Sequence, residues 1–405
     1  MLDDFGQRIR DIILSEMDLS RELSDEEICD LIGSVVSREA RDRPMTIKDR
    51  AELERTIFNS LRKLDVLQEL VDDRDVTEIM VNGPNDIFYE KAGRIQRFKG
   101  HFSSEEKLED VIQQIVGRHN RVVNQASPIV DTRLSDGSRV NIVLNPISIG
   151  GSAVSIRKFP EHPMSMERLV EIEALSPEVA RLLQILMQAK YNIFISGGTG
   201  SGKTTFLNAL SQYIPDDERI ITIEDSAELQ LLGAKNIVRL ETRNANTDGV
   251  TPITIRDLIR TALRMRPDRI IVGECRGAEA LDMLQAMNTG HDGSLSTGHA
   301  NSPYDIISRI ETMVLQGQDF PLNAIRQQIA SGIDIIVQLG RLRDKSRRVL
   351  EISEVDGFMD GEIVLHTLYR FEETAVLDSG RIQGFLKKAG TLCHTDKLMA
   401  AGLSV

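Results

Sequence analysis

The segment NIFISGGTGSGKTTFLNAL, residues 192–210, constrains the fold of this chain more than any other stretch. Residues 193–195 are apolar and strand-sized, residues 197–204 fit the pattern G-x-x-x-x-G-K-S/T, and residues 206–210 are predicted to continue as a helix. A glycine-rich loop between a buried strand and a helix is typical of a phosphate-binding loop. The sequence therefore predicts a nucleotide site built on this strand, loop and helix.

The residue types of the loop suit the binding of a nucleotide. Glycines let the backbone wrap around a phosphate and present its N–H groups, and the start of the helix adds the positive end of its dipole. Lys203 is expected to reach the β- and γ-phosphates of ATP, and Thr204 to offer its hydroxyl to Mg²⁺. The predicted nucleotide-binding residues are Gly197, Gly198, Thr199, Gly200, Ser201, Gly202, Lys203, Thr204 and Thr205.

Two acidic segments follow apolar strands downstream of the loop. RIITIEDSAEL places Glu224 just past one strand, and RPDRIIVGECRG places Glu274 past another, with Gly273 where an aspartate is usual. The carboxyl ends of parallel strands face the ligand crevice, so both glutamates can help to hold Mg²⁺ or to orient the attacking water. The alternative for any one acid is a solvated loop or a helix cap. Whether Asp225 or Glu228 also takes part is left open.

A third segment, NTGHDGSLSTGHANSP, carries His291 and His299 among small polar residues. Such residues suit a loop or strand that passes close to phosphate. A neutral imidazole can sense the γ-phosphate by hydrogen bonding, whereas an isolated surface histidine would carry little weight.

The chain before the loop is predicted to form two further domains. Residues 1–62 contain three amphipathic helical stripes, with Ser24 and Glu27 as a capping box at the second helix. This part is either a plain helical bundle or a docking module for a partner. Residues 63–158 hold short strands and one helix, capped at Ser103 or Ser104, and are predicted to form a small mixed α/β domain. Residues 159–168 are expected to be a linker.

The chain after the linker, residues 169–405, is predicted to be the ATPase domain. Helices alternate with short apolar strands to about residue 340, which indicates a parallel sheet with helices on both faces. Short strands are expected around Gly357 and Gly361 within residues 335–371. The last thirty residues are expected to be helical and peripheral.

The composition narrows the function classes. The net charge is −13, tryptophan is absent and aromatic residues make up 4%, which weighs against a nucleic-acid-binding surface. The three cysteines are widely spaced and indicate reduced thiols rather than disulfides or a metal site. No apolar run approaches the roughly 20 residues that span a bilayer, and the start of the chain is unlike a secretory signal. A cytoplasmic protein is expected.

The four segments GGTGSGKTT, ITIEDSAEL, MRPDRIIVGECRG and TGHDGSLSTGHANSP, in this order, resemble the type II/IV secretion ATPase superfamily. The stretches VTEIMVNGPNDIFYE, ALRMRPDRIIVGE and RGAEALDMLQAMNTGHDGS are most similar to the CpaF-type motors of tight-adherence (Tad) pili. The resemblance covers about residues 60–340 well. It implies an α/β fold in which a RecA-like P-loop motor domain follows the small mixed α/β domain and the N-terminal helical bundle.

The resemblance also implies how the site works. Lys203 and Thr204 bind phosphate and metal, Glu224 belongs to an acidic box, Glu274 looks like the catalytic glutamate, and His299 belongs to a histidine box. The family's subunits form a homohexameric ring and hold ATP between the two α/β domains. Mg²⁺ is the expected metal, with Thr204, Glu224 and Glu274 as candidate ligands.

The family closes its site with arginines from the N-terminal α/β domain, and here Arg133, Arg139 and Arg157 are the residues that match. Arg133 and Arg139 flank Asp136-Gly137, so a hairpin would bring them together, although two exposed hairpin arginines would show the same pattern. Arg243 is a further nucleotide-binding candidate. Gly298 departs from the family pattern, in which a bulkier apolar residue is expected, so the packing around His299 is expected to differ.

The expected function is that of an ATP-hydrolysing motor at the cytoplasmic side of the inner membrane. It would dock on inner-membrane platform proteins and drive a pilus or secretion machine, with the linker at Pro160 to Pro163 as a hinge. No nucleic-acid partner is expected. Two alternatives are a RecA-like nucleic-acid motor, which DNA would stimulate, and a nucleotide-bound scaffold without turnover.

Overall fold

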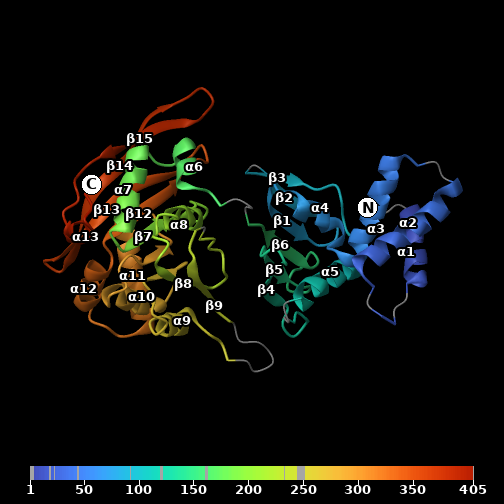
Figure 1. Ribbon diagram of the computed structural model, residues 1–405, viewed down its shortest axis with the longest axis horizontal. Helices are drawn as coiled ribbons and strands as arrows, with labels where there is room; N and C mark the ends of the chain where they lie inside the picture. Colours follow the sequence, from blue (N-terminus) through green and yellow to red (C-terminus); the bar gives the residue numbers. More distant parts are fainter. Residues whose placement is uncertain are drawn as a thin grey trace. The chain divides into compact units, whose positions relative to one another are not determined.

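Two units, Met1–Glu161 and His162–Val405, make up the chain (Figure 1). The computed structural model describes residues 4–17, 20–21, 23–42, 45–91, 93–118, 122–159, 163–231, 233–243 and 251–404. The expected hinge at Pro160 therefore lies outside the described residues, whereas Pro163 lies within them.

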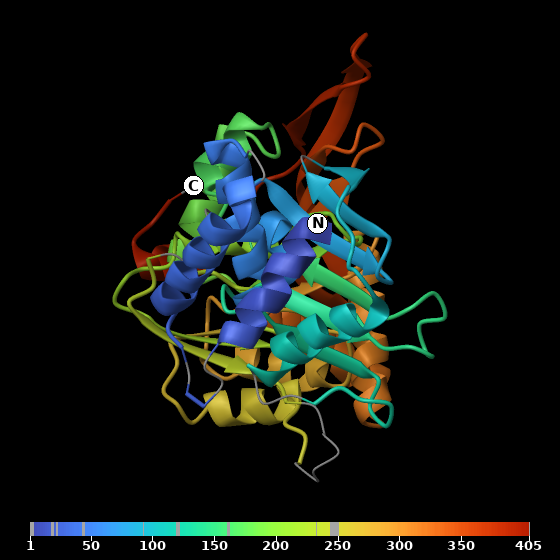
Figure 2. The same ribbon diagram turned by 90° about the vertical axis from the view of Figure 1, so that its right-hand side faces the viewer.

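The first unit begins with three helices that pack side by side (Figure 2). Each buries an apolar stripe in a shared core, as the sequence pattern predicts. The capping box at Ser24 is confirmed, because its hydroxyl accepts from the backbone of Glu27, whose side chain accepts from the backbone of Ser24. Thr46 and Asp49 form a second capping box. The helices are α1 (Asp4–Glu16), α2 (Asp25–Glu39) and α3 (Ile47–Arg62), with the 3-10 turn η1 (Ala40–Asp42) after α2.

A six-stranded antiparallel sheet forms the rest of the first unit, in the order β3-β2-β1-β6-β5-β4. Buried residues alternate along its strands and pack under α5, whose helix is capped by Ser104. The elements are η2 (Asp65–Leu67), α4 (Gln68–Asp72), β1 (Val76–Asn82), β2 (Ile87–Lys91), β3 (Arg94–Arg97), α5 (Glu105–Gly117), β4 (Ile129–Arg133), β5 (Arg139–Val143) and β6 (Ala153–Arg157).

The second unit is built on a nine-stranded sheet in the order β15-β14-β13-β12-β7-β11-β10-β8-β9. The strands from β12 to β9 run parallel, and the strands from β12 to β15 pair antiparallel. The parallel strands are β7 (Ile193–Gly197), β8 (Arg219–Glu224), β9 (Asn236–Glu241), β10 (Arg269–Val272), β11 (Leu295–Gly298) and β12 (Ile335–Arg341). The antiparallel extension is β13 (Arg347–Met359), β14 (Glu362–Val376) and β15 (Ile382–Lys388).

Helices cover both faces of this sheet, which confirms the predicted α/β class. One core is formed with α6 (Met166–Glu171), α7 (Pro177–Gln188), α8 (Lys203–Ser211) and Leu398 of α13 (Asp396–Ala401). The other is formed with α9 (Ile255–Ala262), α10 (Glu279–Asn288), α11 (Pro303–Gly317) and α12 (Leu322–Gly332). The central strands are buried on both faces, so their sequences read as continuous apolar runs.

The C-terminal part differs from the sequence-based expectation. The strands around Gly357 and Gly361 are long, and the described part of the last thirty residues holds β15 and a single helix, α13, of six residues. Gly357, with φ of 130°, lies inside β13 where the pairing register with β14 shifts, so it marks a β-bulge and not a strand end. Asp360 and Gly361, both with positive φ, form the hairpin turn.

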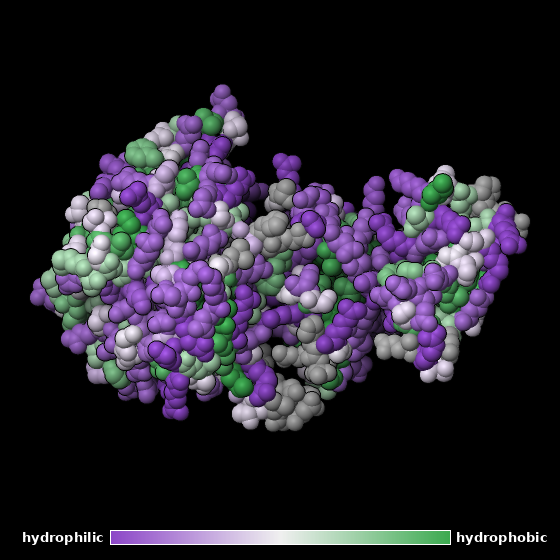
Figure 3. Space-filling view, viewed as in Figure 1, coloured by the Kyte–Doolittle hydropathy of each residue, from purple (hydrophilic) through white to green (hydrophobic). Residues whose placement is uncertain are grey.

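The surface view is largely hydrophilic (Figure 3). Among the described residues, no helix has both the length and the apolar composition needed to cross a membrane.

A fully buried arginine anchors the amino end of β10. The guanidinium of Arg269 is 0% exposed and forms a two-pronged ion pair with Glu218, while it also donates to the carbonyls of Met187 at 2.8 Å and Gly293 at 3.2 Å. Gly293 has φ of 82°, and a Cβ there would lie 2.4 Å from this guanidinium. The Arg269 guanidinium thus connects β10 to α7, through Met187, and to the turn before β11, through Gly293.

Replacing Arg269 by methionine is expected to lower the free energy of unfolding by roughly 3–5 kcal/mol, because Glu218 would remain buried and, among the described residues, would keep an ion pair with Lys190 alone, at 3.4 Å. Urea denaturation followed by circular dichroism measures this. The control is Arg168→Met, which removes an exposed ion pair with Glu171 and should change little. Equal losses in the two variants would contradict the importance of the buried pair.

Candidate active site

The loop between β7 and α8 has the backbone that its glycines predict. Gly200 and Gly202 have φ of 72° and 95°, and Gly202 precedes the first helical residue, Lys203. A Cβ on Gly197 would lie 2.7 Å from the carbonyl oxygen of Leu339 on β12, so the loop can start this close to β12 only with glycine. The backbone N–H groups at the start of α8 are therefore available to a phosphate.

The ammonium of Lys203 is buried at the carboxyl edge of the parallel sheet, with the residue 8% exposed. Its Nζ donates to the carbonyls of Gly197 at 3.0 Å and Gly198 at 3.1 Å, and it lies 3.2 Å from Nδ1 of His299. Burial lowers the pKa of Lys203, and the charge of Glu274 opposes this shift. The lysine therefore already lies where the loop would hold the phosphates.

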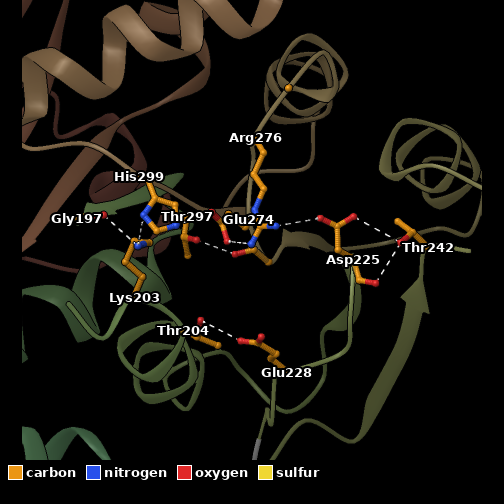
Figure 4. Close-up of polar contacts among 12 residues, drawn as sticks. Gly197, Lys203, Thr204, Asp225, Glu228, Thr242, Glu274, Arg276, Thr297 and His299 are labelled. Atoms are coloured by element: carbon orange, nitrogen blue, oxygen red, sulfur yellow. Dashed lines mark hydrogen bonds and ion pairs between the residues drawn. The ribbon is translucent and has the colours of Figure 1, made fainter. Parts of the chain in front are cut away.

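His299 joins Lys203 to Glu274 (Figure 4). An ammonium can only donate, so Nδ1 of His299 must accept, and the proton of the neutral ring is then on Nε2. Nε2 lies 2.8 Å from Oε1 of Glu274. Burial and the charge of Lys203 lower the pKa of His299, which favours the neutral ring.

Glu274 lies past the end of β10 and is held from two sides. Arg276 donates from Nη2 to Oε2 of Glu274 at 2.6 Å and lies 3.8 Å from Asp225, whereas His299 lies close to Oε1, which has no hydrogen-bond partner among the described residues. Burial acts to raise the pKa of Glu274, but the hydrogen bond and charge of Arg276, with His299 and Lys203, bring it below its ordinary value. The carboxylate is thus ionised and fixed in place.

Glu224, at the end of β8, is 4% exposed. Its Oε1 accepts from the backbone N–H groups of Glu228 at 2.7 Å and Leu229 at 2.9 Å. A Cβ at Gly273 would lie 2.9 Å from Cγ of Glu224, so the Glu224 side chain fills the space in which a residue 273 side chain would start. This explains why glycine replaces the usual aspartate past β10.

The arrangement of Thr204, Glu224 and Glu228 suits a metal ion that binds together with a nucleotide. Oγ1 of Thr204 lies 3.5 Å from Oε2 of Glu228, and Oε2 of Glu224 is buried without a hydrogen-bond partner among the described residues. Within that same part of the chain, no cluster of three or more His, Cys, Asp or Glu side chains could hold a metal alone. Mg²⁺ in phosphate sites needs only one or two protein ligands, since phosphate and water supply the rest.

Two arginines beside the site escaped the sequence analysis. Arg276 lies in the quoted segment ECRG, two residues after Glu274, and this closeness is the signal that could have found it. Arg347, on β13, donates from Nε to the carbonyl of Gly200 at 2.9 Å. No local pattern points to Arg347, because the antiparallel extension of the sheet brings it to the loop.

Two other predicted residues, His291 and Arg243, lie apart from the row of contacts that joins Lys203, His299 and Glu274. His291 precedes β11 and contacts the carbonyl of Ala286 at the end of α10, at the edge of the sheet opposite His299. Arg243 follows β9, donates to the carbonyl of Thr251 at 3.2 Å, and lines a pocket of about 430 Å³ together with Asp225 and Arg276.

Gly298 stands where a bulkier apolar residue was expected, yet it leaves no gap, because Phe194 and Ile306 already lie about 3 Å from where its Cβ would be.

The three arginines that the family resemblance points to, Arg133, Arg139 and Arg157, form one row. Arg133 pairs with Arg139 across β4 and β5, and Arg139 pairs with Arg157 across β5 and β6. Paired residues share a face, so all three lie on one face of the sheet, opposite the buried residues Val140 and Ile156. The hairpin geometry expected from Asp136-Gly137 is therefore present.

A phosphate-binding loop after a central strand of a mainly parallel sheet, with carboxylates past the neighbouring strands, defines a P-loop ATPase of RecA-like fold. Residues 60–383 match the family described as type II/IV secretion system protein, and the chain belongs to this family.

The relatives similar to this chain agree with that membership, and a solved structure shows a similar fold. The chain is 31% identical over 332 residues to the conjugal transfer protein TrbB of Rhizobium radiobacter, covering 81% of this chain and 98% of the relative. It is 33% identical over 320 residues to the type IV secretion system protein PtlH of Bordetella pertussis, covering 73% and 94%. A crystal structure of the pilus retraction motor PilT with bound ADP shares the fold, with a TM-score of 0.55, 22% identity, and coverage of 82% and 84%.

The stability of the ATPase unit is expected to depend on the protonation of Glu224. Burial raises the pKa of Glu224 from 4.5 to about 7, so between these pH values the native chain keeps a proton that the unfolded chain releases. The free energy of unfolding therefore falls as pH rises through this window, by roughly 3 kcal/mol. Glu224→Gln cannot ionise and should be about as stable as wild type at pH 4.5 but more stable at pH 8.

Urea denaturation at several pH values, without nucleotide or Mg²⁺, measures this difference between wild type and Glu224→Gln. Other titrating groups contribute equally to both proteins and cancel in the difference. A difference that does not change with pH would show that Glu224 keeps an ordinary pKa.

Proposed function

We propose that this ATPase is a homohexameric motor that works at the cytoplasmic face of the inner membrane and powers a Tad-type pilus or a related secretion machine. The observation that carries the catalytic part is the row of contacts from Lys203 through His299 to Glu274, at the carboxyl ends of β7, β11 and β10. A scaffold without turnover would not need a catalytic carboxylate that is both ionised and held in place.

In the proposed reaction, Glu274 orients the attacking water and takes its proton. Lys203 exchanges its contacts with the Gly197 and Gly198 carbonyls for phosphate oxygens. His299, whose ring lies between the two, would sense whether a γ-phosphate is present, since a movement of Lys203 toward the phosphate takes away the donor that Nδ1 accepts from.

Mg²⁺ would be held by Thr204 together with Glu224, Glu274 or Glu228, and when bound it would offset charge on the phosphates. Thr204 and Glu228 already face each other, and the buried oxygen of Glu224 lacks a hydrogen-bond partner among the described residues. Asp225 instead faces Thr242 and Arg276, so it has a weaker claim to the metal.

The arginine row is proposed to close the site over ATP. The family resemblance assigns Arg133, Arg139 and Arg157 to this task, and planar guanidinium groups suit the charge that develops on a transferring phosphoryl group. In this proposal the linker at Pro160 to Pro163 is the hinge, ATP closes the first unit on the second, and hydrolysis releases it. Arg243 would contact the nucleotide from the second unit.

The choice of machine rests on the relatives and on local sequence. TrbB and PtlH are named for conjugal transfer and type IV secretion, which supports a role in a secretion machine. The Tad-type assignment rests on the stretches quoted for it, and the docking partners proposed are inner-membrane platform proteins. The acidic chain and its few aromatic residues argue against DNA as the track.

Steady-state ATP hydrolysis by the purified chain tests the catalytic assignment. Mg²⁺-dependent turnover should fall by roughly 10²–10⁴-fold in Glu274→Gln, because the base for water is lost, while nucleotide binding persists. Lys203→Ala should lose turnover and nucleotide binding together.

The matched control is Glu171→Gln, which changes an exposed glutamate on α6 and should keep full activity. Adding single-stranded DNA should leave the rate unchanged. Strong stimulation by DNA would favour a nucleic-acid motor, and a wild-type protein that binds nucleotide but is as inert as Glu274→Gln would contradict the proposed catalytic role.

The arginine proposal has its own test. Arg133→Ala and Arg139→Ala should each lower kcat by roughly 10²–10³-fold with little change in ADP affinity, because they would act on charge that develops during hydrolysis. Arg94→Ala, on the exposed strand β3 of the same sheet, serves as the control. Wild-type turnover in both test variants would remove these arginines from the mechanism.

A further inference from the structure

A pocket of about 580 Å³ lies within the first unit, between the helical bundle and the α/β domain. Its walls come from α1 and α3 on one side, and from β2, β3, the segment after β3 and α5 on the other. Hydrogen bonds from Lys107 to the Ser60 carbonyl and from Gln114 to the Arg62 carbonyl connect the two sides. The volume is that of a site for a small molecule.

Positive charge is concentrated in this pocket. Five cationic side chains line it and only two acids do, although the whole chain has a net charge of −13. Like charges raise each other's energy at short range, and a concave wall strengthens their field. The cations are Arg10, Arg55, Arg97, Lys99 and Lys107, and the acids are Asp65 and Glu69.

Nearby acids neutralise these cations only in part. Asp65 lies 3.8 Å from the Lys107 ammonium and also interacts with the charge of Arg10, and Asp86, which does not line the pocket, pairs with Arg97 at 2.6 Å. Nε of Arg10 is buried and has no hydrogen-bond partner among the described residues. A buried guanidinium N–H without an acceptor is costly, so this N–H is available to an acceptor from outside the chain.

Apolar surface adjoins the charges. Tyr89 and Phe98 also line the pocket and pack edge to face, with ring centroids 6.3 Å apart at 85°. The Tyr89 hydroxyl donates to Gln96, another lining residue. Cations beside aromatic rings suit a ligand that carries both an anionic group and a flat ring.

We propose that this pocket binds a phosphate-bearing small molecule of nucleotide size, separate from the ATP site, and that the bound phosphates join the helical bundle to the α/β domain. A polyanion such as DNA fits less well, because the cations line a recess in an otherwise acidic chain and not an extended strip. The bound ligand would reach Arg10 and Arg55 from the bundle and Lys99 and Lys107 from the domain. This gives the bundle a regulatory role that does not depend on the motor proposal.

Calorimetric titration of the full chain tests the proposal, with inorganic pyrophosphate and guanosine 5′-monophosphate as probes. The chain is first saturated with ADP so that the phosphate-binding loop is filled. At least one probe should bind, and Arg55→Glu with Lys99→Glu should weaken that binding tenfold or more, since two attractive charges become repulsive.

The matched control is Lys48→Glu with Arg94→Glu, which makes the same charge change on exposed residues of α3 and β3 outside the pocket. It should keep affinity within about twofold of wild type, and circular dichroism checks that both variants fold. Binding of neither probe, or equal losses in the two variants, would overturn the proposal.

Hydrogen exchange locates the binding. The probe should slow amide exchange in α3 and in the segment from β3 to α5. Protection confined to residues 197–204 would place the probe at the ATP site and would also overturn the proposal.

Discussion

The burial of the Lys203 ammonium is the constraint on which the ATPase unit depends. A buried cation must find acceptors, and here they come from the end of β7 and from His299 at the end of β11, whose second ring nitrogen faces Glu274 beyond β10. The register of these parallel strands decides whether the row of contacts forms, since a slip of one residue would turn side chains to the other face. The helices on both faces hold that register by burying every central strand.

The features that could be predicted from the sequence are those encoded by residues close together along the chain. The loop, the capping residues Ser24 and Ser104, and the hairpin that pairs Arg133 with Arg139 each depend on residues close along the chain. The α/β class followed from alternating segments. Arg347 could not be found in this way, because 147 positions separate it from Gly200 and only the pairing of distant strands brings them together.

The wrong predictions for the C-terminal strands arise because contacts between distant parts of the chain decide these structures. A glycine such as Gly357 fits a turn or a bulge equally well by sequence, and the partner strand β14 decides which one forms. β15 carries little apolar alternation because most of its residues are not buried, so nothing local marks it as a strand. The basic pocket is similarly hidden, since its cations are spread from α1 to α5 in a chain that is acidic as a whole.

The close packing of Gly273 against Glu224 has a consequence for how this family can diverge. The two positions lie on neighbouring strands and share one volume, so a side chain at 273 and a glutamate at 224 exclude each other. A relative with an aspartate past β10 must carry a shorter or displaced acid past β8, because either substitution alone would crowd the two side chains. The two positions should therefore change together among relatives, as a linked exchange of the carboxylate from one strand to its neighbour.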